Sequence, residues 1–146
     1  MKIAIGSDHG GFKLKEVIKN YLIDKGYQVD DLGCYSEESV DYPDFAEKVA
    51  KAVAGGDFNL GVLMCGTGIG ISIAANKVKG IRAALCHDGL TARLAKQHNN
   101  ANIICMGGRT TGVETAKDII DNFLSSEFEG GRHLRRINKI KDMENS

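Results

Sequence analysis

The segment Cys65-Gly66-Thr67-Gly68-Ile69-Gly70 places a thiol directly before three glycines at alternate positions. Glycines let the backbone approach a ligand closely, and successive N–H groups at a helix start form a nest for an anion. The same N–H groups and the helix dipole favour a thiolate at Cys65, which can act as a base or as a nucleophile. The segment therefore predicts an anion site beside a reactive sulfur.

Two familiar glycine motifs do not fit this segment. A P-loop is excluded because no Gly-Lys-Ser/Thr follows, here or after the Gly6–Gly11 stretch. The dinucleotide fingerprint requires a glycine at position 71, which is Ile71, although Asp88 lies about twenty residues downstream as that fingerprint expects. A nicotinamide site and a strand-to-helix turn without a ligand remain as alternatives.

Other groups that titrate or bind anions occur near the ends of the expected elements. They are Asp8 and His9, His98 and Asn99, Arg109, and a pair of arginines, Arg132 and Arg136, whose spacing of four places them on one face of a helix. No two histidines have metal-ligand spacing on one element, so the sequence predicts no metal site. The four cysteines lack a CxxC pair, which predicts free thiols in a reducing compartment.

Short apolar runs alternate with helical patterns along the chain. We expect strands at 2–6, 27–32, 60–64, 81–86 and 102–106, and helices after each of them, the third running to about residue 78. This alternation predicts a Rossmann-like three-layer α/β/α sandwich with a five-stranded parallel sheet and a C-terminal helical tail. Ligands of such sheets bind at the carboxyl ends of the strands, where Asp8, Cys65 and Arg109 fall.

The composition limits the classes of protein to which this chain can belong. A chain of 146 residues suits one domain, 1–146, whose residues 128–146 form a basic tail. Lys plus Arg and Asp plus Glu are both 19, and this zero balance argues against general binding to nucleic acid or membrane surfaces. No apolar stretch approaches the ~20 residues of a membrane span, nor is there a signal peptide, so we expect a cytoplasmic protein.

Several motifs together resemble those of ribose-5-phosphate isomerase type B, over about residues 2–140. They are Ser7-Asp8-His9-Gly10-Gly11, Asp41-Tyr42-Pro43, the run Cys65-Gly66-Thr67-Gly68-Ile69-Gly70-Ile71-Ser72-Ile73-Ala74-Ala75-Asn76-Lys77, Gly80-Ile81-Arg82-Ala83, His98-Asn99 and Gly130-Gly131-Arg132-His133. The resemblance implies interconversion of ribose 5-phosphate and ribulose 5-phosphate in the pentose phosphate pathway, without metal or organic cofactor. It also implies a homodimer, or a dimer of such dimers, with active sites at the subunit interface.

The resemblance assigns roles to individual residues. Cys65 matches the base that abstracts the proton, and His98 matches the acid that opens the sugar ring. The loop from Gly66 to Gly70 matches an anion hole, in which Thr67 also offers a catalytic hydroxyl. The substrate-binding positions implied are Asp8, His9, Gly66, Thr67, Gly68, Ile69, Gly70, Asn99, Arg109, Arg132 and Arg136.

Alternatives remain at the level of substrate and chemistry. Relatives of this kind include isomerases of allose 6-phosphate and of galactose 6-phosphate. The galactose enzymes divide the motifs between two different subunits, whereas this chain carries all of them, which favours a self-sufficient homodimer. Cys65 as a covalent nucleophile in acyl or phosphoryl transfer is a second enzymatic hypothesis. A sensor domain that binds a phosphosugar or a nucleotide without turnover is a third hypothesis.

Overall fold

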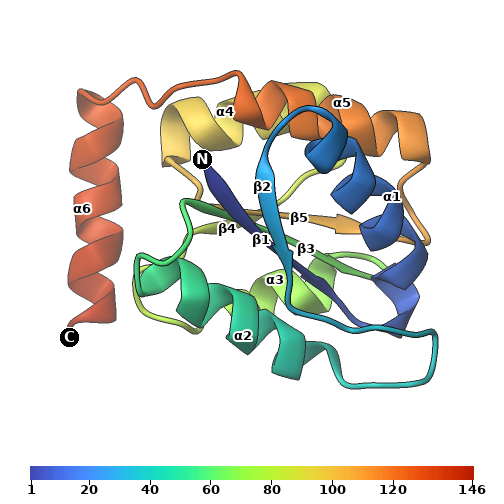
Figure 1. Cartoon of the computed structure of the whole chain (residues 1–146). Coiled ribbons are helices and arrows are strands. Elements are labelled where there is room, and N and C mark those ends of the chain that lie inside the picture. The colour runs from blue at the N-terminus through green and yellow to red at the C-terminus, as the bar shows by residue number, and fades with distance from the viewer.

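A computed structural model describes all residues, 1–146, and has at its centre one sheet of five parallel strands (Figure 1). The order across the sheet is β2-β1-β3-β5-β4. The strands are β1 (Lys2–Ser7), β2 (Gln28–Asp31), β3 (Leu60–Cys65), β4 (Ala83–Leu85) and β5 (Ile103–Gly107). The central strands β3 and β5 are buried along their whole length, as their apolar sequences predict.

Helices cover both faces of the sheet, so the predicted three-layer sandwich is confirmed. One face carries α1 (Phe12–Asp24), α4 (Gly89–Asn99) and α5 (Val113–Leu124), and the other carries α2 (Tyr42–Ala54) and α3 (Ile69–Ala75). Each face has its own apolar core, with Phe123 and Met64 buried in one and Val49 and Leu63 in the other. No helix is both long enough and apolar enough to cross a membrane.

The predicted boundaries differ most around the fourth strand. We expected a strand at 81–86 and a helix to about residue 78, whereas β4 spans three residues and α3 ends at Ala75. The cause is Asn76, whose side-chain amide bonds both the N–H (2.8 Å) and the carbonyl (2.9 Å) of Ala83. Arg82 N–H, in turn, donates to the Asn102 side chain at 2.8 Å. Side chains thus replace ladder bonds at this edge of the sheet.

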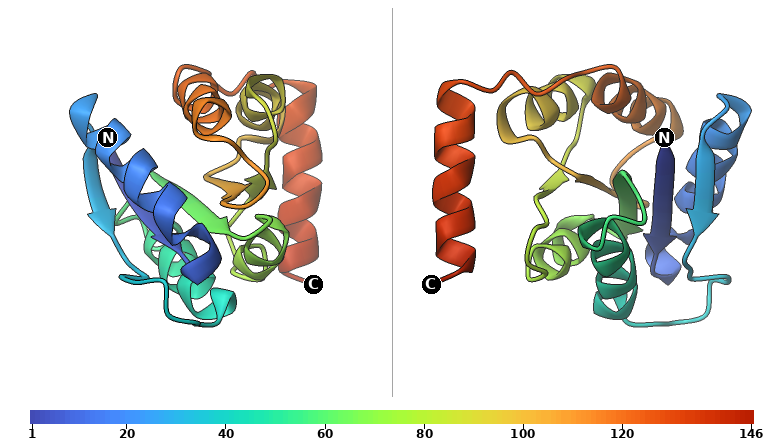
Figure 2. Two further views of the ribbon diagram at one scale, coloured as in Figure 1. Left: turned by 90° about the vertical axis from the view of Figure 1, so that its right-hand side faces the viewer. Right: turned by 60° about the vertical axis from the view of Figure 1, so that its left-hand side comes forward.

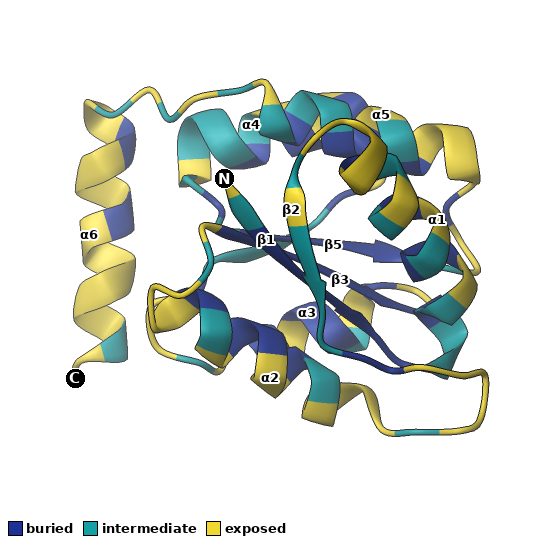
Figure 3. Cartoon of the chain, viewed as in Figure 1, coloured by how far each residue is buried: buried dark blue, intermediate teal, exposed yellow.

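The last helix, α6 (Arg132–Glu144), confirms the predicted helical tail but does not join either layer. It stands beside the sandwich next to β4, at the end of a linker that follows α5, and the right-hand view of Figure 2 shows the same separation. Only His133 and Ile137 of this helix are buried, so almost its whole surface is open (Figure 3).

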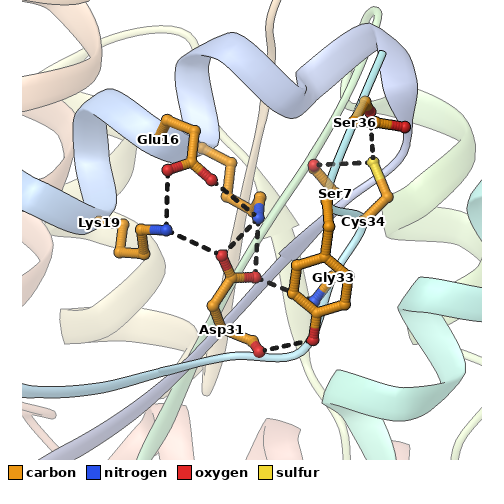
Figure 4. A network of polar contacts seen from close by, with 9 residues as sticks. Ser7, Glu16, Lys19, Asp31, Gly33, Cys34 and Ser36 are labelled. Atoms are coloured by element: carbon orange, nitrogen blue, oxygen red, sulfur yellow. Dashed lines mark hydrogen bonds and ion pairs between the residues drawn. The ribbon is translucent and has the colours of Figure 1, made fainter. Parts of the chain in front are cut away.

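A buried ion network joins α1 to the end of β2 (Figure 4). The Lys15 side chain is 0% exposed, and its Nζ lies 2.6 and 2.7 Å from the two carboxylate oxygens of Asp31. Lys19 Nζ also bonds Asp31, at 3.0 Å, and Gly33 N–H donates to it at 2.9 Å. Burial alone would raise the pKa of Asp31, but the bonds from Lys15, Gly33 and Lys19 outweigh it and lower the pKa.

Candidate active site

The carboxyl ends of β1, β3 and β5 converge, and the loops that follow them are held together by backbone bonds. Gly108 N–H donates to the Cys65 carbonyl at 2.8 Å, and Arg109 N–H donates to the Gly66 carbonyl at 2.9 Å. Asp8 N–H reaches the Met64 carbonyl at 3.2 Å. A side chain at Gly108 would collide with the Gly10 carbonyl, so glycine is required for this close approach.

Cys65 is the last residue of β3 and is 5% exposed. Its Sγ accepts a hydrogen bond of 3.2 Å from the N–H of Gly68, whose φ of 77° places the backbone in the left-handed region that favours glycine. A donated N–H stabilises the thiolate form. The helix begins at Ile69, a little later than the sequence predicts, so this contact comes from the loop rather than from the helix itself.

Asp8 and His9 lie beside the loop that follows Cys65, Thr67 belongs to that loop, and local hydrogen bonds fix all three. Asp8, which is buried, accepts the Gly11 N–H through Oδ1 at 3.1 Å. His9 Nδ1 accepts the Val40 N–H at 3.1 Å, which leaves Nε2 to carry the proton of the neutral ring. Thr67 is exposed, and its Oγ1 accepts the Ile69 N–H at 3.2 Å, so its hydroxyl hydrogen is available to a ligand.

A cavity of about 380 Å³ opens beside these loops. Two cationic side chains, Lys13 and Arg109, contribute to its wall together with His9, and Lys13 Nζ lies 3.3 Å from a Glu37 carboxylate oxygen. The Arg109 guanidinium lies over the Gly66 backbone, where a Cβ would be 3.3 Å from Nη1. This arrangement suits an anionic ligand that reaches both the cavity and the loop after Cys65.

The remaining predicted residues lie near the amino ends of the strands on the β4 side of the sheet, whereas Cys65 lies at a carboxyl end. His98 and Asn99 end α4, and the Asn99 carbonyl accepts a 3.1 Å bond from Arg82, which directly precedes β4. Arg132 and Arg136 belong to the first turns of α6, beside the same edge. A strand of six residues such as β3 spans about 17 Å, so within one chain His98 cannot approach Cys65.

Sequence reasoning missed two members of this second group. The His133 ring stacks on the His98 ring with centroids 4.3 Å apart and planes 9° apart, and Glu129 approaches both rings. His133 is 7% exposed, and burial, with the neighbouring charges of His98 and Arg132, lowers its pKa. The spacing of four between Glu129 and His133 is a weak signal, but their contact with His98 arises only from the tertiary structure.

Comparison with known proteins decides the family. Residues 3–140 match a sequence family that is described as Ribose/Galactose Isomerase. The chain belongs to the ribose/galactose isomerase family. Among family members, ribose-5-phosphate isomerase B of Escherichia coli is 50% identical over 143 residues, which cover 98% of this chain and 96% of that protein.

Solved structures of family members share the whole fold. Ribose-5-phosphate isomerase B of Clostridium thermocellum has a TM-score of 0.99 at 54% identity, covering 99% of this chain and 98% of that one. The Mycoplasma genitalium enzyme, solved with bound ribulose 5-phosphate, has a TM-score of 0.95 at 48% identity and covers 99% and 97%. The predicted family, Rossmann-like fold and isomerase class are therefore confirmed, whereas the roles of individual residues stay predictions.

Proposed function

We propose that this member of the ribose/galactose isomerase family interconverts ribose 5-phosphate and ribulose 5-phosphate through an enediolate, with Cys65 as the general base. One observation carries the assignment of the base: the Cys65 Sγ lies at the junction of three strand ends, with the Gly68 N–H directed at it. The similarity to the E. coli ribose-5-phosphate isomerase B supports the choice of substrate.

Aldose–ketose isomerisation moves one proton between adjacent carbons. The Cys65 thiolate removes it from one carbon and returns it to the next on the same face of the sugar. The backbone N–H groups of Thr67 and Gly70 have no partner within the chain, so they can donate to the oxygen that becomes negative in the enediolate. One donor of this kind contributes ~2.7–4 kcal/mol in comparable oxyanion holes.

Ring opening requires an acid near the same substrate, and we assign it to His98 of a second copy of the chain. Within one chain Cys65 lies at the carboxyl ends of the strands and His98 near their amino ends. Helix α6 also exposes Leu134, Ile140 and Met143, and a groove of about 770 Å³ lies between α6 and the edge beside β4. A second copy covers these apolar side chains and brings the two half-sites together. We therefore propose a homodimer with shared active sites.

Mixing two inactive variants tests the shared site. A Cys65→Ala chain and a His98→Asn chain are each expected to be inactive alone. After co-refolding in equal amounts, half of the dimers are mixed and one of their two sites is intact, so activity returns to about a quarter of the wild-type value. Mixing either variant with itself is the control. Absence of recovery, with mixed dimers detected by mass spectrometry, would place both groups in one chain.

The sugar phosphate is held by the arginines of the two half-sites, Arg109 from one and Arg132 with Arg136 from the other. Charge-assisted bonds to phosphate contribute ~1.5–3 kcal/mol each. Arg136→Ala should therefore raise KM about tenfold or more, with a smaller change in kcat. Arg135→Ala, one position along α6 and on another face, is the matched control. An unchanged KM in Arg136→Ala would remove this residue from the phosphate site.

Substrate breadth and location complete the proposal. Steady-state assays with ribose 5-phosphate, allose 6-phosphate and galactose 6-phosphate, with and without a chelator, rank the substrates. If a six-carbon sugar phosphate were the best substrate, it would replace the pentose phosphate in the proposal. Loss of activity on chelation would contradict a cofactor-free reaction.

We also propose that the protein is located in the cytoplasm. All four cysteines are free thiols, which is the usual state of cysteine in that reducing compartment.

A further inference from the structure

His98, Glu129 and His133 form a cluster that the proposed reaction does not use as a whole. His98 ends α4, Glu129 lies in the linker before α6, and His133 is in the first turn of α6. Each offers one ligand atom, and the three atoms lie within 4.8 Å of one another. Two imidazole nitrogens and one carboxylate oxygen form a donor set that suits Zn²⁺ and neighbouring divalent transition metals.

The distances within this cluster are close to those of a metal site. Glu129 Oε1 lies 3.6 Å from His98 Nε2 and 3.5 Å from His133 Nε2. Ligand atoms at ~2.0–2.1 Å from a tetrahedral ion are about 3.4 Å apart, so both pairs are nearly at that spacing. The two rings are stacked, and the His98 side chain, 38% exposed at the end of its helix, can turn its nitrogen toward the other two atoms.

A second observation points to a ligand. His133 Nε2 is buried and has no hydrogen-bond partner, although a carboxylate oxygen is 3.5 Å away. Buried polar atoms without a partner are rare, and each calls for an explanation. A cation between the three atoms would satisfy this nitrogen.

We propose that His98, Glu129 and His133 bind a divalent transition metal such as Zn²⁺ and that this binding inhibits the enzyme. The inhibition rests on the proposed function, because the metal occupies the His98 nitrogen assigned to ring opening. Arg132 and Arg136 are close enough to weaken the attraction for a cation. The site is therefore a reversible regulatory one that empties when free metal is scarce, and it supplies nothing to the reaction.

Co²⁺ titration of the purified full-length protein tests the site without reference to activity. We expect one equivalent per chain to produce the visible absorption bands of tetrahedral Co²⁺, and Zn²⁺ to displace them. Glu129→Gln and His133→Asn should weaken binding tenfold or more, whereas Glu114→Gln, an exposed carboxylate on α5, should not. Thermal unfolding confirms that each variant is folded. Bands that are absent, or unchanged in both variants, would overturn the proposal.

Binding through a cysteine is separated from this site by two readouts. Thiolate ligation gives an intense near-ultraviolet charge-transfer band, which we do not expect. The Cys65→Ser variant should therefore retain its Co²⁺ bands. Loss of the bands in this variant would move the metal to the thiol and overturn the proposed ligand set.

Kinetics test the inhibitory part separately. Zn²⁺ should inhibit turnover, a chelator should restore it, and Glu129→Gln should require at least ten times more Zn²⁺ for the same inhibition. Binding at the three residues without inhibition would overturn the regulatory role. The protein could instead bind Co²⁺ as described and yet isomerise no phosphosugar when it is free of metal. That result would contradict the proposed function but not the metal site.

Discussion

Cys65→Ala is expected to lose turnover while the protein still binds ribose 5-phosphate. General base catalysis contributes typically 10²–10⁴-fold, so we expect kcat to fall by about that range. Binding persists because the phosphate contacts and the loop N–H groups do not depend on the sulfur. Steady-state kinetics give the loss, calorimetry gives the affinity, and exchange of the substrate proton with D₂O reports the transfer step directly.

Cys86→Ala is the matched control for deletion of a thiol. Cys86 is buried, and burial raises its pKa to about 11, so it stays a neutral packing group. We expect this variant to keep near-normal kcat. Near-normal kcat in Cys65→Ala would exclude the thiolate as base. A covalent adduct trapped on Cys65 with the native substrate would instead favour the nucleophilic alternative.

The second large effect concerns stability: Lys15→Met should destabilise the fold by about 3 kcal/mol. The substitution keeps the volume of the side chain but leaves the Asp31 carboxylate, whose side chain is 15% exposed, without its main partner. Breaking a buried pair from one side costs ~3–5 kcal/mol, and Lys19, which still contacts Asp31, places the effect at the lower end. Urea denaturation followed by circular dichroism measures it.

The pH dependence of stability gives an independent check on this pair. The pKa of Asp31 is lowered in the folded protein, so its ionisation stabilises the fold above its unfolded pKa. That contribution disappears as the pH falls through the folded pKa. Lys15→Met should weaken this acid-limb dependence, because Gly33 and Lys19 still bond Asp31, and Lys15→Met with Asp31→Asn should regain most of the lost stability. Equal stability of the single variant and the wild type at pH 7 would contradict the assignment.

Local sequence patterns were sufficient to predict the order of strands and helices and the three-layer sandwich. The apolar run at 60–64 and the glycines after Cys65 predict a buried strand followed by a tight loop, and the structure contains both. The strand of three residues at β4 could not be predicted, because it depends on the contact of Asn76 with Ala83. The burial of Lys15 could not be predicted either, because a lysine within a helical pattern indicates a solvent-exposed position. In the structure, the ion pair with Asp31 compensates the cost of burying the lysine.

The candidate site was predictable only in its parts. The residue pattern made Cys65 a candidate and the family resemblance added His98, while the rule that ligands bind at the carboxyl ends of strands placed Asp8, Cys65 and Arg109 together. His98 lies near the amino ends of the strands because α4 runs antiparallel to them, which the motifs do not express. The buried nitrogen of His133 likewise depends on the way α6 returns to α4.

The amide of Asn76 has a consequence for assembly. It satisfies both backbone groups of Ala83 on the outer side of β4, so these two groups are not available to a further strand. Exposed strand margins invite further strands, and repeated addition produces fibres. The second copy proposed above would instead dock through side chains of α6 and the adjoining groove. Two-fold docking of that kind closes on itself, so the proposed dimer would not extend through this surface into an open-ended polymer.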